Sequence, residues 1–233
     1  MYTIGYSYIW LIIFCFFFSF ANAQEEKPTR RDTAFAEIKN LKESTLVVRL
    51  TSHHKKVQAL QKLANNPELA KRKKERIRHQ IATTLAETAY ENKLIYQAFE
   101  KYYKFSKVLF MYDTATTTLI KEKRRNGLFL DGNLVIDQSL TIQTEDFFML
   151  KFDRTDPTTT AAADAMIITD RDFQDLKRPF PYAVKMTSFS FVMDSVFSPK
   201  EAFEKNMNTR VKKLARQLNA FHKKAVEQTI LSR

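Results

Sequence analysis

The apolar and polar positions of this chain predict two strands joined by helices in its first half. Thr45–Leu50 and Lys107–Tyr112 are short runs of apolar and β-branched residues, which is typical of buried strands. Between them, from Glu68 to about Lys104, apolar residues recur every three or four positions, which predicts a long amphipathic helix. Because a helix separates the two strands, we expect them to lie parallel in one sheet.

Shorter helices are predicted on both sides of the first strand. Asp32 suits the cap of a helix that ends near Leu41. Ser52 suits the N-cap of another that reaches about Leu63, and Pro67 suits the first turn of the long helix.

The second half of the chain predicts more strands and a closing helix. Extended segments are expected at 139–143, 147–152, 165–169 and 180–186, and we interpret them as antiparallel additions to the sheet. After Pro199, apolar residues again follow helical spacing. The fold class is therefore α/β: one domain of residues 24–233, with a mixed sheet packed by a long central helix and a C-terminal helix. The alternative is a sheet covered on one face only.

Residues 1–23 have the pattern of a signal peptide. An apolar run of 12 residues, Ile9–Phe20, precedes Ala21-Asn22-Ala23 and a polar stretch, as in a cleavable segment. A membrane span needs about 20 apolar residues, so a permanent anchor is the weaker interpretation. We expect an exported protein, periplasmic or extracellular, with no transmembrane span after the signal is removed.

Charge and composition narrow the functional classes. The formal net charge is +12, which favours an anionic envelope component or an acidic protein as partner; the alternative is a solvated basic surface. The only cysteine, Cys15, lies in the signal peptide, so disulfides and cysteine-based sites are excluded from the mature domain. Gly127 and Gly132 are its only glycines, too few for a nucleotide-binding loop, and no cofactor is expected. Aromatic residues lack the regular basic interleaving of a base-stacking surface, so nucleic acid is not an expected partner.

Four segments of the chain carry a resemblance: Leu46–Leu50, Asn92–Phe99, Val108–Tyr112 and Leu176–Tyr182, the last with the run Arg-Pro-Phe-Pro-Tyr. In their order and spacing the chain resembles a family of uncharacterised, exported Bacteroidetes proteins. The resemblance implies an envelope location and no catalytic residue.

One candidate anion site lies after the first strand. Ser52, His53, Lys55 and Lys56 open a helix, where free N–H groups and a partial positive charge favour a bound anion. The alternative is an ordinary surface helix start with screened charges.

A second candidate site combines Arg49 with carboxylates. Asp113 and Asp170 each follow a predicted strand, and ligands of open α/β sheets gather at the carboxyl ends of strands. A cluster of these residues with His53 would form a pocket; the alternative is a structural ion pair or an exposed arginine. No metal site is predicted, because the alternating carboxylates at 170–175 lack the central glycine and terminal glutamate of a calcium loop.

Three functions stay open at this level. The first is a non-catalytic envelope protein that binds an anionic ligand or partner. The second is a hydrolase that uses carboxylates at strand ends, and the third is a structural interaction module. Whether the protein is an enzyme is not decided by the sequence, although the absence of known motifs favours a binding protein.

Overall fold

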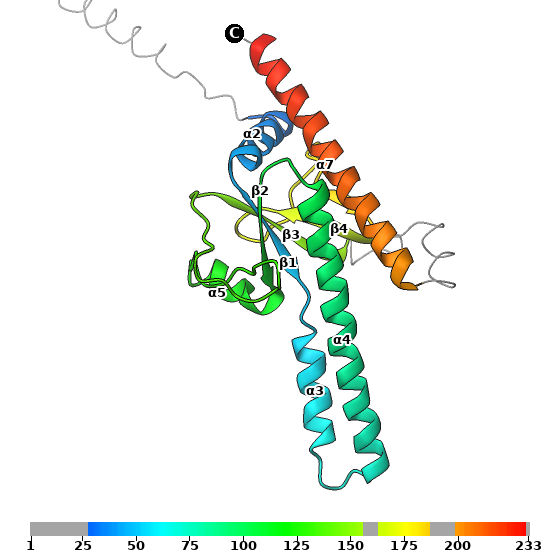
Figure 1. Ribbon diagram of the computed structural model, residues 1–233. Helices are drawn as coiled ribbons and strands as arrows, with labels where there is room; N and C mark the ends of the chain where they lie inside the picture. The colour runs from blue at the N-terminus through cyan, green and yellow to red at the C-terminus, as the bar shows by residue number, and fades with distance from the viewer. Residues whose placement is uncertain (1–27, 156–162, 187–198, 232–233) are drawn as a thin grey trace, which may run out of the picture.

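A computed structural model of the chain describes residues 28–155, 163–186 and 199–231 (Figure 1). The predicted signal peptide lies outside these residues. The described helices and strands follow in the order α2 (Arg30–Glu43), β1 (Thr45–Leu50), α3 (His54–Ala64), α4 (Lys71–Tyr102), β2 (Lys107–Tyr112), η1 (Asp113–Ala115), α5 (Thr116–Ile120), β3 (Phe147–Arg154), β4 (Asp164–Thr169), β5 (Ala183–Lys185) and α7 (Pro199–Leu231). No described helix is both long and apolar enough to cross a membrane.

The described strands form one mixed sheet, as expected from the sequence, and their order in it is β2-β1-β3-β4-β5. Strand β1 lies parallel to both neighbours, so Val48 is paired with Phe110 of β2 and with Leu150 of β3. Strands β4 and β5 are antiparallel additions. The expectation that residues 147–152 also add antiparallel is wrong. Residues 113–146, which we call the excursion, connect β2 to β3. They return the chain to the amino end of β1 before β3 begins.

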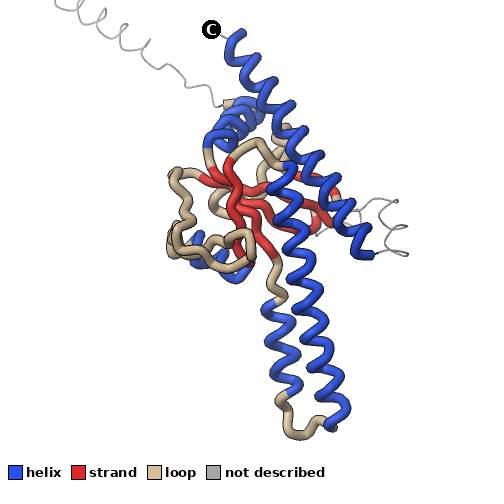
Figure 2. The backbone as a smooth tube through the Cα atoms, viewed as in Figure 1, coloured by secondary structure: helices blue, strands red, loops and turns tan. Residues whose placement is uncertain are grey.

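Both faces of the parallel strands are covered (Figure 2). One face packs on α2, α4 and α7, with Leu46, Phe99 and Leu214 fully buried. The other face packs on residues of the 113–146 excursion, where Val47 and Phe129 are fully buried. The alternative of a sheet covered on one face only is therefore wrong for these strands. The face opposite the helices is covered by residues of the excursion.

Three local predictions need correction. The N-cap of α3 is His53, in a left-handed conformation with φ 52°, and not Ser52. Pro67 lies in the turn before α4, which begins at Lys71. Residues 139–143 form no strand; Thr141 makes only an isolated bridge with Asn126.

Candidate functional site

The most strongly charged feature of the molecule is a helical arm, defined here as residues 54–81. It comprises α3, the connecting turn and the first part of α4, which pair side by side and project away from the sheet (Figure 1). The arm carries nine Lys or Arg residues against two Glu, a formal charge of +7 out of +12 for the whole chain. These cations are Lys55, Lys56, Lys62, Lys71, Arg72, Lys73, Lys74, Arg76 and Arg78, and all except the half-buried Lys74 are exposed. Within the described parts of the chain, none of them is in an ion pair.

The start of α4 goes against the usual electrostatic preference of helices. Neither α3 nor α4 has an acidic residue in its first turn or a side-chain N-cap hydrogen bond. Helix α2, by contrast, begins with a capping box between Thr29 and Asp32. Cations near a helix N-terminus are disfavoured by the helix dipole, and Lys71–Lys74 puts four of them there. The start of α4 is therefore electrostatically unfavourable within the described part of the chain.

The base of the arm is fixed by two polar contacts. Asp113 Oδ1 accepts hydrogen bonds from the backbone N–H of Ser52, at 3.0 Å, and from the Ser52 hydroxyl. The buried Asn92 side chain donates to the Thr51 carbonyl at 2.9 Å. The structure thus brings two predicted site residues, Ser52 and Asp113, together. The Asp113 carboxylate occupies the position beside the start of α3 where the sequence predicted a bound anion.

Replacing Asp113 by alanine tests this contact. The substitution leaves the half-buried Ser52 N–H and hydroxyl without their acceptor, which costs on the order of 1–3 kcal/mol of unfolding free energy. Urea denaturation measures the loss. The control is Asp113→Asn, which keeps a carbonyl acceptor and should lose clearly less. Equal stability of the alanine variant and the natural protein would contradict the structural role.

Arg49 lies on the β1 face that packs against the excursion. Its Nε donates to the Thr116 hydroxyl at 2.9 Å, and its guanidinium carbon lies 5.5 Å from the centroid of the Phe173 ring. Among the described residues no carboxylate forms an ion pair with it. These contacts hold Arg49 as part of the packing around the excursion.

Asp170 lies at the opposite end of the sheet from Asp113. Because β4 is antiparallel to β3, Thr169 pairs with Met149 near the amino end of β3, and Asp170 follows it there. Asp113 follows the carboxyl end of β2. The predicted cluster of Arg49, Asp113 and Asp170 is therefore not assembled.

Asp170 instead borders a pocket of about 230 Å³ that is rich in carboxylates. Glu37 of α2, Asp146 and Asp172 also line it. Burial, followed by the charge of Asp170, raises the pKa of Glu37. Asp170 Oδ1 accepts backbone N–H bonds from Asp172 and Gln174, at 3.0 and 2.8 Å. Glu37 was not predicted as a site residue, because it is distant in sequence from Asp170 and follows the ordinary pattern of α2.

Glu37 gives a testable pH dependence. Because the pKa of Glu37 is raised in the folded state, its protonated carboxyl contributes favourably to the free energy of unfolding. This contribution is complete at acidic pH and is lost as the pH rises through the folded-state pKa. Glu37→Gln should therefore stabilise the protein at about pH 7 and change it much less at about pH 4. Urea denaturation at both pH values measures this difference. Glu43→Gln, which removes the same charge from the exposed end of α2, is the control; equal pH effects in both variants would refute the assignment.

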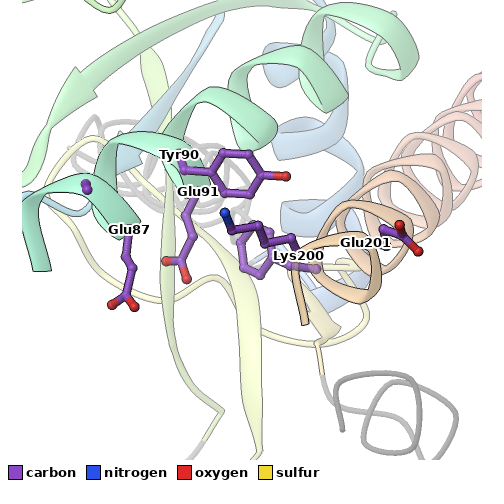
Figure 3. A pocket seen from close by; sticks show the side chains of 7 residues that line it. Glu87, Tyr90, Glu91, Lys200 and Glu201 are labelled. Carbon is purple, nitrogen blue, oxygen red and sulfur yellow. The ribbon is translucent and has the colours of Figure 1, made fainter. Parts of the chain in front are cut away.

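An open groove of about 740 Å³ lies between α4 and the start of α7 (Figure 3). Glu87 and Glu91 lie on its α4 side and Glu201 on α7. The Lys200 ammonium lies 5.3 Å from the centroid of the Tyr90 ring. Desolvation raises the pKa of Glu91, which the positive charge of His53 opposes and the charge of Glu87 reinforces. No residue predicted as a site lines this groove.

No family model, curated protein or solved structure matches this chain. The resemblance to exported Bacteroidetes proteins stays a prediction.

Among the described residues, no three His, Cys, Asp or Glu side chains are grouped to hold a metal ion. Of the predicted anion-site residues, Lys55 and Lys56 lie in the first turns of the arm, and His53 immediately precedes it.

Proposed function

We propose that this is an exported, non-catalytic envelope protein that binds an extended polyanion through its helical arm. Export is predicted by residues 1–23, and the basic surface that the sequence indicated as a whole is concentrated on one projecting element. The observation that carries the proposal is the set of nine arm cations without an ion-pair partner among the described residues.

The spread of these cations favours a polymer or surface over a small anion. A helix rises about 1.5 Å per residue, so the cations of Lys71–Arg78 alone extend over roughly 10 Å, and those of α3 lie beside them. One small anion would satisfy only a few of them. Phosphorylated lipid headgroups and acidic glycans are the envelope polyanions with matching chemistry.

The test is titration of the protein with vesicles containing phosphatidylglycerol and, separately, with a sulfated polysaccharide. The negative controls are neutral phosphatidylcholine vesicles and an uncharged polysaccharide. Binding to vesicles alone assigns the headgroup surface, and binding to the polysaccharide alone assigns an acidic glycan. Absence of binding to both at low salt would reject the proposal and favour a structural interaction module.

One observation supports the hydrolase as a second candidate. Glu37, whose pKa is raised, lies near Asp170, whose carboxylate is held by two backbone N–H groups, and such a difference in environment suits an acid and base pair. This hydrolase would use Glu37 with Asp170 in place of Asp113 and Arg49. Hydrolysis of glycosidic or phosphate-ester model substrates that is lost in Glu37→Gln and Asp170→Asn would support it.

A further inference from the structure

The free end of the helical arm combines cations with exposed apolar side chains. We call residues 62–74 the tip; they comprise the end of α3, the connecting turn and the start of α4. Helix α4 joins the base of the arm at Asn92, which bonds to Thr51. Because a helix rises about 1.5 Å per residue, Lys71 lies roughly 30 Å along α4 from Asn92. The tip is therefore the part of the arm farthest from the sheet (Figure 1).

Apolar side chains are gathered around the connecting turn. Leu63 is 46% exposed. Pro67 and Ala70 are exposed as well, and Leu69 is half-buried. The backbone N–H of Asn66 donates to the Leu63 carbonyl and that of Leu69 to the Asn66 carbonyl, both at 3.2 Å, so these residues share one compact end of the hairpin. One exposed leucine is ordinary, whereas apolar residues grouped at a protruding end indicate a contact surface.

Cations surround this apolar end. The tip has five Lys or Arg residues against the single acid Glu68, a formal charge of +4. The Lys74 ammonium donates to the Pro67 carbonyl at 3.5 Å, which holds one cation beside the turn. The other four are exposed and, within the described parts of the chain, have no ion-pair partner: Lys62, Lys71, Arg72 and Lys73. Segments that enter the interface of an anionic bilayer combine apolar side chains with cations in this way.

The composition of the tip favours a bilayer over an acidic glycan. Both ligands would attract the cations, but only a bilayer also offers an apolar phase to Leu63. The shape of the arm favours contact through its end. Screening limits surface attraction to about 8 Å at physiological ionic strength. Lys55 and Lys56 lie roughly 12 Å or more of helix before the end of α3, so a bilayer at the tip would attract them weakly.

We propose that the tip docks end-on onto an anionic lipid bilayer, with Leu63 entering the boundary between headgroups and acyl chains and the tip cations contacting lipid phosphates. This inference rests on the function proposed above, and it assigns the lipid surface as the polyanion. The sheet is then held away from the membrane by the length of the arm (Figure 1).

The first experiment measures the affinity of the full chain for vesicles of phosphatidylglycerol and phosphatidylcholine in equal parts, and for dextran sulfate. Leu63→Ala should weaken vesicle binding roughly three- to tenfold, because half a leucine side chain no longer leaves water on binding. Its binding to dextran sulfate should be unchanged. Leu85→Ala is the matched control, since Leu85 is 48% exposed but lies roughly 20 Å along α4 from Lys71, and it should bind as the natural protein does.

Paired charge variants test the end-on orientation. Lys71→Gln combined with Lys73→Gln should weaken vesicle binding by roughly tenfold or more. Lys55→Gln combined with Lys56→Gln removes the same charge from the other end of the arm and should lose much less. Equal losses in the two pairs would show that the arm lies flat and would overturn docking through the tip.

Tryptophan fluorescence tests insertion directly. Trp10, in the predicted signal peptide, is the only tryptophan of the chain, so Leu63→Trp with Trp10→Phe places a single reporter at the tip. Its emission should shift to shorter wavelength with the vesicles and not with dextran sulfate. Leu85→Trp with Trp10→Phe should shift with neither. This measurement keeps a large apolar side chain at position 63, so it holds even if Leu63→Ala perturbs the hairpin.

The proposal is overturned if Leu63→Ala binds the vesicles as tightly as Leu85→Ala, or if the emission of Leu63→Trp does not shift. In either case, binding of the natural protein to vesicles or to dextran sulfate would still support the function proposed for the arm. A natural protein that is dimeric by light scattering and becomes monomeric in Leu63→Ala would assign the tip to a second copy, and would also overturn the proposal. Absence of binding to both ligands rejects the function of the arm and this inference with it.

Discussion

Simultaneous replacement of Lys71, Arg72, Lys73 and Lys74 by glutamine is expected to weaken binding to phosphatidylglycerol vesicles by roughly a hundredfold or more. Each Lys or Arg near an anionic membrane surface contributes about 1 kcal/mol, so four substitutions remove a few kcal/mol of binding free energy. The affinity of the natural protein should also fall as salt is added, because exposed charges are screened. Vesicle co-sedimentation across a salt series measures both effects. Since the cations are disfavoured at the N-terminus of α4, the variant should fold at least as stably as the natural protein.

The control for this experiment is a second quadruple variant on α7. Replacing Lys213, Arg216, Lys223 and Lys224 by glutamine removes the same total charge from exposed positions outside the arm. It should lose much less affinity. Equal losses in the two variants would show that net charge, and not the arm, determines binding.

Truncation of Phe99 to alanine is expected to lower the free energy of unfolding by about 3–5 kcal/mol, the usual cost of a cavity at a fully buried phenylalanine. Phe99 is 0% exposed. Its ring meets Phe110 of β2 edge-on, with centroids 6.1 Å apart, and lies 5.7 Å from that of Tyr103. It therefore couples α4, the helix that carries the arm, to the sheet.

Urea denaturation with a common slope measures the effect of Phe99→Ala. Gln97→Ala, two residues away on the exposed side of α4, is the control and should change the unfolding free energy by no more than about 0.5 kcal/mol. A Phe99→Ala variant as stable as this control would contradict the packing of α4 on the sheet.

Most elements of the fold follow from local pattern. The long helices α4 and α7 follow from apolar residues at helical spacing, and the strands at Thr45–Leu50 and Lys107–Tyr112 follow from short runs of apolar and β-branched residues. Parallel pairing of these two strands also follows, because a helical connection returns the chain to the same end of the sheet. The direction of β3 does not follow, since the irregular excursion at 113–146 has no periodicity that shows where the chain returns.

The candidate sites also combine features that the sequence shows with features that only the folded chain decides. The sequence by itself determined that the chain has a formal net charge of +12, that a long helix follows Pro67, and that residues 24–233 contain no cysteine and only two glycines. Only the tertiary structure decided that Asp113 accepts hydrogen bonds from Ser52, and that Asp170 lies at the other end of the sheet beside Glu37. Charge and periodicity are properties of neighbouring residues and are visible along the chain. Distances between side chains from separate elements depend on strand direction and packing, which are fixed only when the whole chain folds.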